Sequence, residues 1–125
     1  MRNLILIAAA SAALSACATG PVATFDPNGS EWTGWVRFTA DEFQLYANEN
    51  QVLQPFSRPC LSGALPRDEQ RQYRELSGTK VQVTGRTTPW SANQPGARIE
   101  HEGSVIRNDC DGAVVILADD MKPVA

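Results

Sequence analysis

Two adjacent segments of the chain alternate apolar with polar residues, and this pattern restricts the fold more than any other feature. Residues 32–39 and 42–47 place apolar or small side chains at every second position. A period of two is typical of a β-strand buried on one face only. Because Ala40-Asp41 does not favour a tight two-residue turn, we expect a four-residue loop from Thr39 to Glu42. The segments thus predict a hairpin that pairs Gly34 with Ala47, Trp35 with Tyr46, Val36 with Leu45, Arg37 with Gln44, and Phe38 with Phe43.

Residues 66–76 predict a helix. Pro66 suits the first turn, and Asp68 and Glu69 interact favourably with the positive N-terminal end. Gly78 can adopt the left-handed conformation that closes a helix. Three apolar residues in and beside this segment would cover one end of a sheet: Leu65, Tyr73 and Leu76.

Further strands are expected at residues 60–62 and 79–87. Residues 98–110 and 113–118 then predict a terminal hairpin. Asp111-Gly112 lies between these two segments, and Asp-Gly is a strong signal for a type I′ turn.

The expected order, with a helix between the third and fourth strands, is that of the OB barrel, whose helix closes one end. Residues 76–85, LSGTKVQVTG, also resemble the L-x-G-x-x-V-x-V-x-G segment that leads into the fourth strand of bacterial OB-like proteins. We therefore expect a mainly β chain, folded as a small five-stranded OB-like barrel with one short helix. Another small β sandwich or an α+β roll would also accommodate these elements.

The N-terminus has the features of an export signal. Arg2 precedes the apolar stretch 4–14, LILIAAASAAL, which is too short to span a bilayer as a helix. The stretch ends in Leu14-Ser15-Ala16-Cys17, which resembles the lipobox of bacterial lipoproteins. This resemblance implies that residues 1–16 are removed and that Cys17 carries diacylglycerol and further acyl chains, which anchor the protein to a membrane. An ordinary signal peptide with an incidental cysteine is the alternative.

The resemblance also implies a location. In Gram-negative lipoproteins an Asp after the lipidated Cys favours the inner membrane, whereas here Ala18 follows. We therefore expect an outer-membrane anchor, with the protein facing the periplasm. Residues 17–30 would form the lipidated Cys and a flexible tether, because they are rich in Ala, Thr, Gly and Pro. The folded domain is expected at residues 31–121 and a short tail at 122–125.

The two remaining cysteines predict a disulfide. With Cys17 lipidated, Cys60 and Cys110 are an even pair in an oxidising compartment. Their bond would close a loop of roughly 50 residues and stabilise the fold by roughly 4 kcal/mol. Two separate buried thiols are the alternative.

Composition and motifs argue against several classes of function. The chain has 11 Lys and Arg against 14 Asp and Glu, a net charge of −3, so nucleic acid is not an expected partner. A single His and no closely spaced cysteines leave no metal site, and no cofactor motif is present. His101 lies between Glu100 and Glu102, but strand neighbours point to opposite faces, so we expect a surface His rather than a catalytic base. We therefore expect a protein that is not an enzyme.

A ligand or partner site is expected on the polar face of the first hairpin, because OB barrels bind ligands over their second and third strands. This face carries Trp35, Arg37, Gln44 and Tyr46. An aromatic pair beside an Arg can stack on a sugar or anchor a protein. Alternatively, Trp35 packs beneath residues 48–59 or the tether as part of a satellite core.

These features together predict an envelope lipoprotein that binds a protein partner or a cell-wall glycan. Trp90, in a Pro-bounded loop, is a further candidate contact. The alternative function is an inhibitor or protective factor that presents residues 89–95 to a periplasmic hydrolase.

Lipidation of Cys17 is directly testable. Cys17→Ser removes the sulfur that would accept the lipid, so the variant should lose incorporation of labelled palmitate and leave its leader uncleaved. Intact mass measures both changes. Ser15→Ala, which keeps a small residue before the cleavage site, is the matched control. A wild-type chain whose mass shows no lipid would contradict the prediction.

Overall fold

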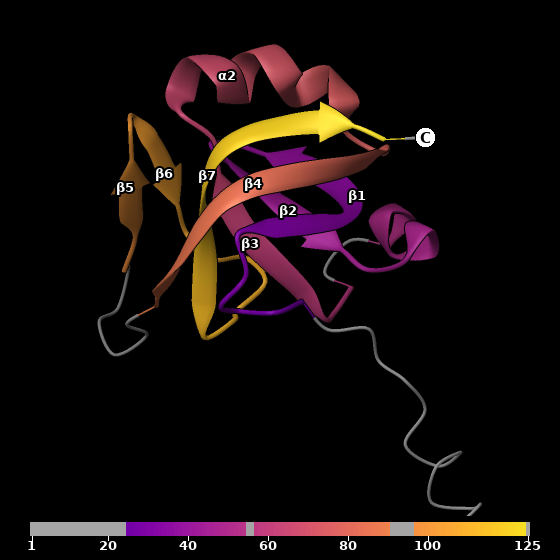
Figure 1. Ribbon diagram of the computed structural model, residues 1–125, viewed down its shortest axis with the longest axis horizontal. Coiled ribbons are helices and arrows are strands. Elements are labelled where there is room, and N and C mark those ends of the chain that lie inside the picture. The colour runs from indigo at the N-terminus through magenta and orange to yellow at the C-terminus, as the bar shows by residue number, and fades with distance from the viewer. Residues whose placement is uncertain (1–24, 55–56, 91–96, 125) are drawn as a thin grey trace, which may run out of the picture.

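The computed structural model describes residues 25–54, 57–90 and 97–124. Five strands close into a barrel in the order β1-β2-β3-β7-β4, and β3 and β7 run parallel while the other neighbours are antiparallel (Figure 1). The chain is therefore mainly β, with the expected OB-like barrel. The barrel strands are β1 (Glu31–Thr39), β2 (Glu42–Tyr46), β3 (Cys60–Ala64), β4 (Lys80–Pro89) and β7 (Val114–Pro123).

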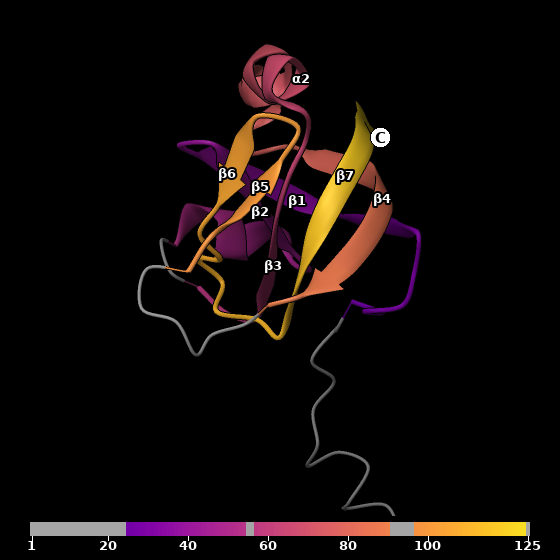
Figure 2. The same ribbon diagram turned by 90° about the vertical axis from the view of Figure 1, so that its left-hand side faces the viewer.

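A short helix covers one end of the barrel. It comprises α2 (Arg67–Gln72) and the 3-10 turn η2 (Tyr73–Leu76), and both views place it over the same open end (Figures 1 and 2). Leu65 is fully buried in the core, and Tyr73 and Leu76 pack against it. Gly78 follows with a φ of +93°. The predicted helix and its covering role are confirmed.

The predicted register of the first hairpin is confirmed. The structure pairs Trp35 with Tyr46, Arg37 with Gln44, and, on the inner face, Val36 with Leu45 and Phe38 with Phe43. The expected four-residue loop is wrong, because Thr39 pairs with Glu42 and Ala40-Asp41 alone make the turn. Ala40 has a φ of +52°, and its carbonyl accepts a hydrogen bond from Arg74 Nη2 at 3.2 Å. The hydrogen bond from Arg74, which lies in η2, thus stabilises a left-handed conformation that Ala40 does not favour by itself.

The expected terminal hairpin across Asp111-Gly112 is wrong. The chain instead reverses at Glu102 and Gly103, whose φ angles are +45° and +91°, and there joins β5 (Ile99–His101) to β6 (Ser104–Ile106). Two successive positive φ angles are the geometry of a type I′ turn. The hairpin forms a small sheet beside the barrel (Figure 2). The last strand, β7, pairs with β4 on one side and with β3 on the other, and these two pairings close the barrel.

The packed region extends beyond both expected boundaries. Strand β7 continues to Pro123, and Met121 is buried in the core. At the other end Phe25 packs against the core, and Trp32 Nε1 donates to the carbonyl of Asp26 at 2.8 Å. The end of the segment expected to be a tether thus lies on the barrel. The lipobox and Cys17 lie outside the described residues.

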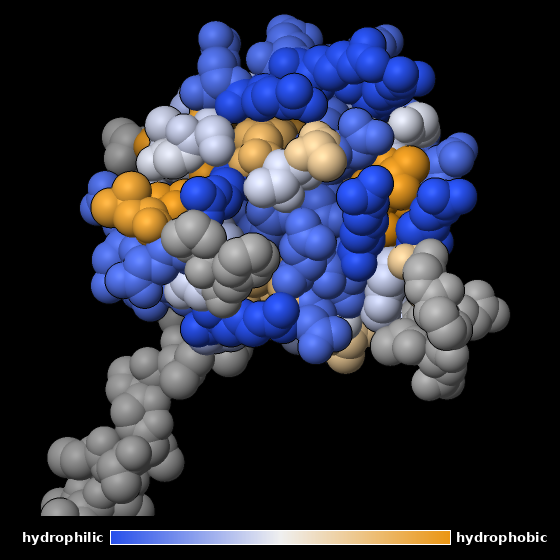
Figure 3. All heavy atoms as spheres, turned by 180° about the vertical axis from the view of Figure 1, so that it is seen from behind, coloured by the Kyte–Doolittle hydropathy of each residue, from blue (hydrophilic) through white to orange (hydrophobic). Residues whose placement is uncertain are grey.

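Two apolar clusters stabilise the fold. Among the described residues, eleven from all five strands and the segment before α2 are buried in the barrel interior. A second cluster joins β6 to β3 and β7. Leu53, in the 3-10 turn η1 (Glu49–Leu53), is the exposed large hydrophobic residue of the described chain. In Figure 3 hydrophobic residues outside the grey-covered parts form small patches separated by hydrophilic ones. No helix of the described ranges is long and apolar enough to cross a membrane.

Gly34 is required by the close approach of β1 and β2. A Cβ there would lie 2.4 Å from the carbonyl oxygen of Tyr46. Gly34→Ala should therefore lower the free energy of unfolding by about 1–3 kcal/mol, as overpacking does. Urea unfolding measures this loss. Gly29→Ala, where the nearest atom would be 3.4 Å away, is the control, and equal stability of the two variants would contradict the assignment.

Candidate functional site

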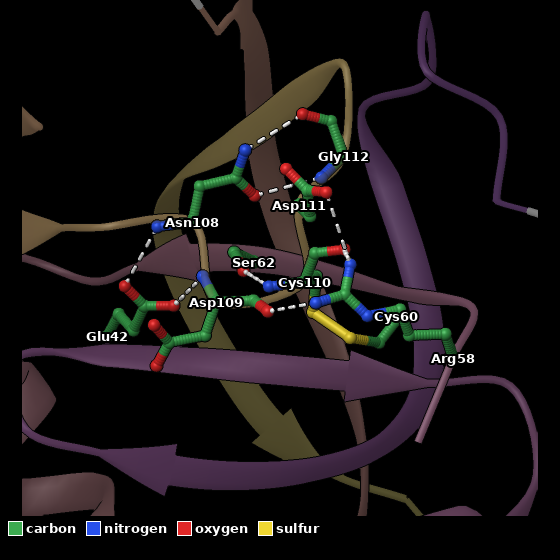
Figure 4. Close-up of polar contacts among 9 residues, drawn as sticks. All are labelled: Glu42, Arg58, Cys60, Ser62, Asn108, Asp109, Cys110, Asp111 and Gly112. Carbon is green, nitrogen blue, oxygen red and sulfur yellow. Dashed lines mark hydrogen bonds and ion pairs between the residues drawn. A yellow bond between two sulfur atoms is a disulfide. The ribbon is translucent and has the colours of Figure 1, made fainter. Parts of the chain in front are cut away.

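A buried carboxylate holds the loop that follows β6. Glu42, at the start of β2, is only 2% exposed. Its Oε1 accepts hydrogen bonds from the backbone N–H groups of Arg107 at 2.6 Å and Asn108 at 3.2 Å. Its Oε2 accepts from the backbone N–H of Asp109 at 3.0 Å (Figure 4). The same oxygen also accepts from Gln44 Nε2 at 3.0 Å. Four hydrogen bonds, three from successive backbone N–H groups and one from a side-chain amide, thus offset the free-energy cost of burying the carboxylate.

Asn108 shapes the same loop, residues 107–112. Its φ is +64°, a left-handed conformation that Asn tolerates better than most residues. The side-chain Oδ1 accepts from the backbone N–H of Gly112 at 3.1 Å, and Nδ2 donates to the carbonyl of Gly112 at 2.8 Å (Figure 4). The loop is therefore closed on itself as well as docked on Glu42.

The predicted disulfide is confirmed and attaches this loop to β3. Cys60 and Cys110 are bonded, with a Cα–Cα distance of 5.4 Å, and the Cys110 N–H donates to Ser62 Oγ at 2.9 Å. Arg58 Nη1 donates to the carbonyl of Cys110 at 2.6 Å and Nη2 to that of Asp109 at 3.1 Å. The Arg58 guanidinium also lies 3.7 Å from the carboxylate of Asp111. This ion pair is exposed, so it contributes little to the stability of the fold.

A cavity of about 240 Å³ opens between the first hairpin, the segment 57–60 and the docked loop. We call it the hairpin pocket. It lies over β1, β2 and the first residue of β3, so it includes part of the face of the second and third strands where OB barrels bind ligands. Its lining residues are Arg37, Thr39, Gln44, Tyr46, Ser57, Arg58, Cys60 and Asp109.

Hydrogen bonds hold part of the pocket wall in place. Gln44 Nε2 donates to Thr39 Oγ1 at 2.9 Å as well as to Glu42, and Thr39 Oγ1 lies 3.4 Å from Asp109 Oδ2. Tyr46 is 2% exposed, so its ring is part of the wall rather than a free surface. Arg37 is half-buried, and its guanidinium makes no hydrogen bond or ion pair with any described residue. The pocket therefore combines a hydrogen-bonded wall with the guanidinium of Arg37, which has no polar partner among the described residues.

The pocket unites three of the four residues expected on the hairpin face, and Trp35 is the exception. It is half-buried, and Lys80 Nζ lies over its ring, 5.1 Å from the centroid. Such a cation–π contact occupies the aromatic face. Four lining residues were missed by sequence reasoning: Thr39, Ser57, Arg58 and Asp109. The position of Arg58, two residues before Cys60, was the available signal for its place beside the disulfide.

Two other candidates are held by packing, one partly buried and one inside the protein. Trp90 is half-buried against the second apolar cluster, together with Ile99. His101 is 6% exposed, so the expectation of a surface His is wrong. Its Nε2 donates to the Ala118 carbonyl at 2.9 Å, because β5 packs against β7 rather than lying on the surface. Residues 91–96, most of the candidate inhibitory loop, lie outside the described residues.

The comparisons identify no relative: no protein-family model, curated protein or solved structure matches this chain. Within residues 25–54, 57–90 and 97–124 no group of three or more His, Cys, Asp or Glu side chains is arranged to hold a metal ion. The candidate site is therefore characterised by its own geometry.

Glu42→Gln tests the docking of the loop. The amide keeps one acceptor but places an NH₂ group against backbone donors, so the free energy of unfolding should fall by about 1.5–3 kcal/mol. Hydrogen exchange should also accelerate at the amides of residues 107–109. Glu31→Gln, at an exposed position on β1, is the control for the loss of one charge. Unchanged exchange in the loop would show that Glu42 does not hold it.

Proposed function

We propose that this protein is a non-catalytic lipoprotein of the outer membrane whose barrel binds a protein partner through the hairpin pocket. The observation that carries the proposal is the convergence of Arg37, Gln44 and Tyr46 on one pocket of the OB binding face. Concave sites with a few convergent polar groups are where proteins bind ligands.

The shape of the site favours a protein side chain over a sugar. Lys80 covers the ring of Trp35, and Tyr46 is buried, so the face offers no open aromatic platform for stacking. The volume of about 240 Å³ is also below the roughly 300–1,000 Å³ typical of small-molecule sites. A single inserted side chain suits this pocket.

The anchor follows from the sequence around Cys17. Two or three acyl chains on this residue would give stable attachment where one chain would be marginal. Only seven residues separate Cys17 from Phe25, which packs on the barrel. The domain would therefore sit close to the membrane surface, where it meets partners that are also attached to the envelope.

Site-specific photo-crosslinking in living cells tests the proposal. A photoreactive phenylalanine analogue at Asp109 lies at the pocket wall, where the backbone of Asp109 rather than its side chain is bonded to Glu42 and Arg58. Ultraviolet light should yield one discrete protein adduct. The same analogue at Arg86, exposed on β4, is the control and should give none. Equal adducts from both positions, or adducts with cell-wall fragments alone, would contradict binding of a protein here.

A further inference from the structure

We infer that the hairpin pocket accepts a carboxylate, an Asp or Glu side chain of the partner protein, and that Arg37 anchors it. This inference rests on the proposed function and adds the chemistry of the recognised group. It depends on which of the two guanidinium groups that line the pocket already has hydrogen-bond partners.

Arg37 and Arg58 both line the pocket, but they are not equivalent. Arg58 has its Nη atoms on the carbonyls of Asp109 and Cys110 and its charge beside Asp111. Arg37 has no polar partner within the described residues. A guanidinium offers paired donors whose geometry matches a carboxylate. A ligand carboxylate would therefore accept two parallel hydrogen bonds from Arg37.

The charge of the pocket differs from that of the chain. Its lining holds two Arg residues and one acidic residue, Asp109, whereas the chain as a whole carries a net charge of −3. The buried carboxylate of Glu42 is turned to the backbone of the loop and does not line the pocket. Because Arg58 is paired with Asp111, the guanidinium of Arg37 is the group in the described lining that attracts an anion.

The wall favours a carboxylate over a phosphate. A phosphorylated side chain carries about −2 and three acceptor oxygens, more than the Arg37 guanidinium and a hydroxyl can bond and neutralise beside the negative charge of Asp109. Ser57 Oγ accepts a long hydrogen bond, 3.5 Å, from Gln51 Nε2, which leaves its hydroxyl proton for a ligand oxygen. Within the described lining, the Arg37 guanidinium and the Ser57 hydroxyl can therefore both donate to a single carboxylate.

Titration of the purified full chain, as the cell processes it, with short blocked peptides tests the inference. The probes share the sequence Gly-Ser-X-Ser-Gly, where X is Glu, Gln or phosphoserine, and a muropeptide is the fourth probe. Nitrogen-resolved NMR follows the Arg37 Nε–H and the Gln44 side-chain amide. The Glu peptide should give saturable shifts with a dissociation constant on the order of 1 mM, and the Gln peptide should give none.

Two variants assign the effect to Arg37. Arg37→Gln should weaken binding of the Glu peptide at least about tenfold, the loss expected for a charged hydrogen bond. Arg86→Gln removes the same charge from β4, outside the pocket, and should bind as wild type. Spectra that are unchanged away from residue 37 would show that Arg37→Gln still folds.

Several outcomes would overturn the inference: no saturable shift with the Glu peptide, equal binding by Arg37→Gln, or tighter binding of the phosphoserine peptide or the muropeptide. These failures are distinct from failure of the proposed function. A protein adduct at Asp109 that persists in Arg37→Gln would leave partner binding standing and remove only the carboxylate.

Discussion

The carboxylate of Glu42 is the contact on which the candidate site depends. It receives three successive backbone N–H groups from residues 107–109, more than 60 positions away in the chain. A buried charge is tolerated only when its hydrogen-bonding capacity is met, and here the loop meets it. The same bonds satisfy backbone donors that the loop, lacking strand partners, would otherwise leave unpaired.

A second attachment acts on the other side of the loop. The disulfide, Ser62 and Arg58 bind residues 109–111 to β3 and the segment before it. The loop is therefore held by both β2 and β3, and the space left between these attachments and the first hairpin is the pocket. A binding surface made partly of loop can be rigid when it is fastened in this way.

Sequence reasoning succeeded where the determining contacts are local. The register of the first hairpin follows from alternation with a period of two, because a shift by one residue would turn Val36 and Leu45 outward. It failed at the C-terminal strands, where both Glu102-Gly103 and Asp111-Gly112 carry turn signals. The choice between them was made by β7, whose pairing with β3 and β4 closes the barrel. It also failed at His101, whose burial depends on β5 packing against β7.

By itself the sequence determined the hairpin face, the helix over the barrel end, the cysteine pair and the expectation of a lipid anchor at Cys17. The hairpin and the helix depend on periodicity and end signals over short distances along the chain, whereas the cysteine pair and the anchor depend on the number and chemistry of the cysteines. Only the tertiary structure decided that Arg58 binds the docked loop while the Arg37 guanidinium has no polar partner among the described residues. It also decided that Lys80 lies over Trp35 and that Asp109 lines the pocket. The reason is physical: such contacts join segments far apart in sequence, and their geometry exists only once the barrel has closed.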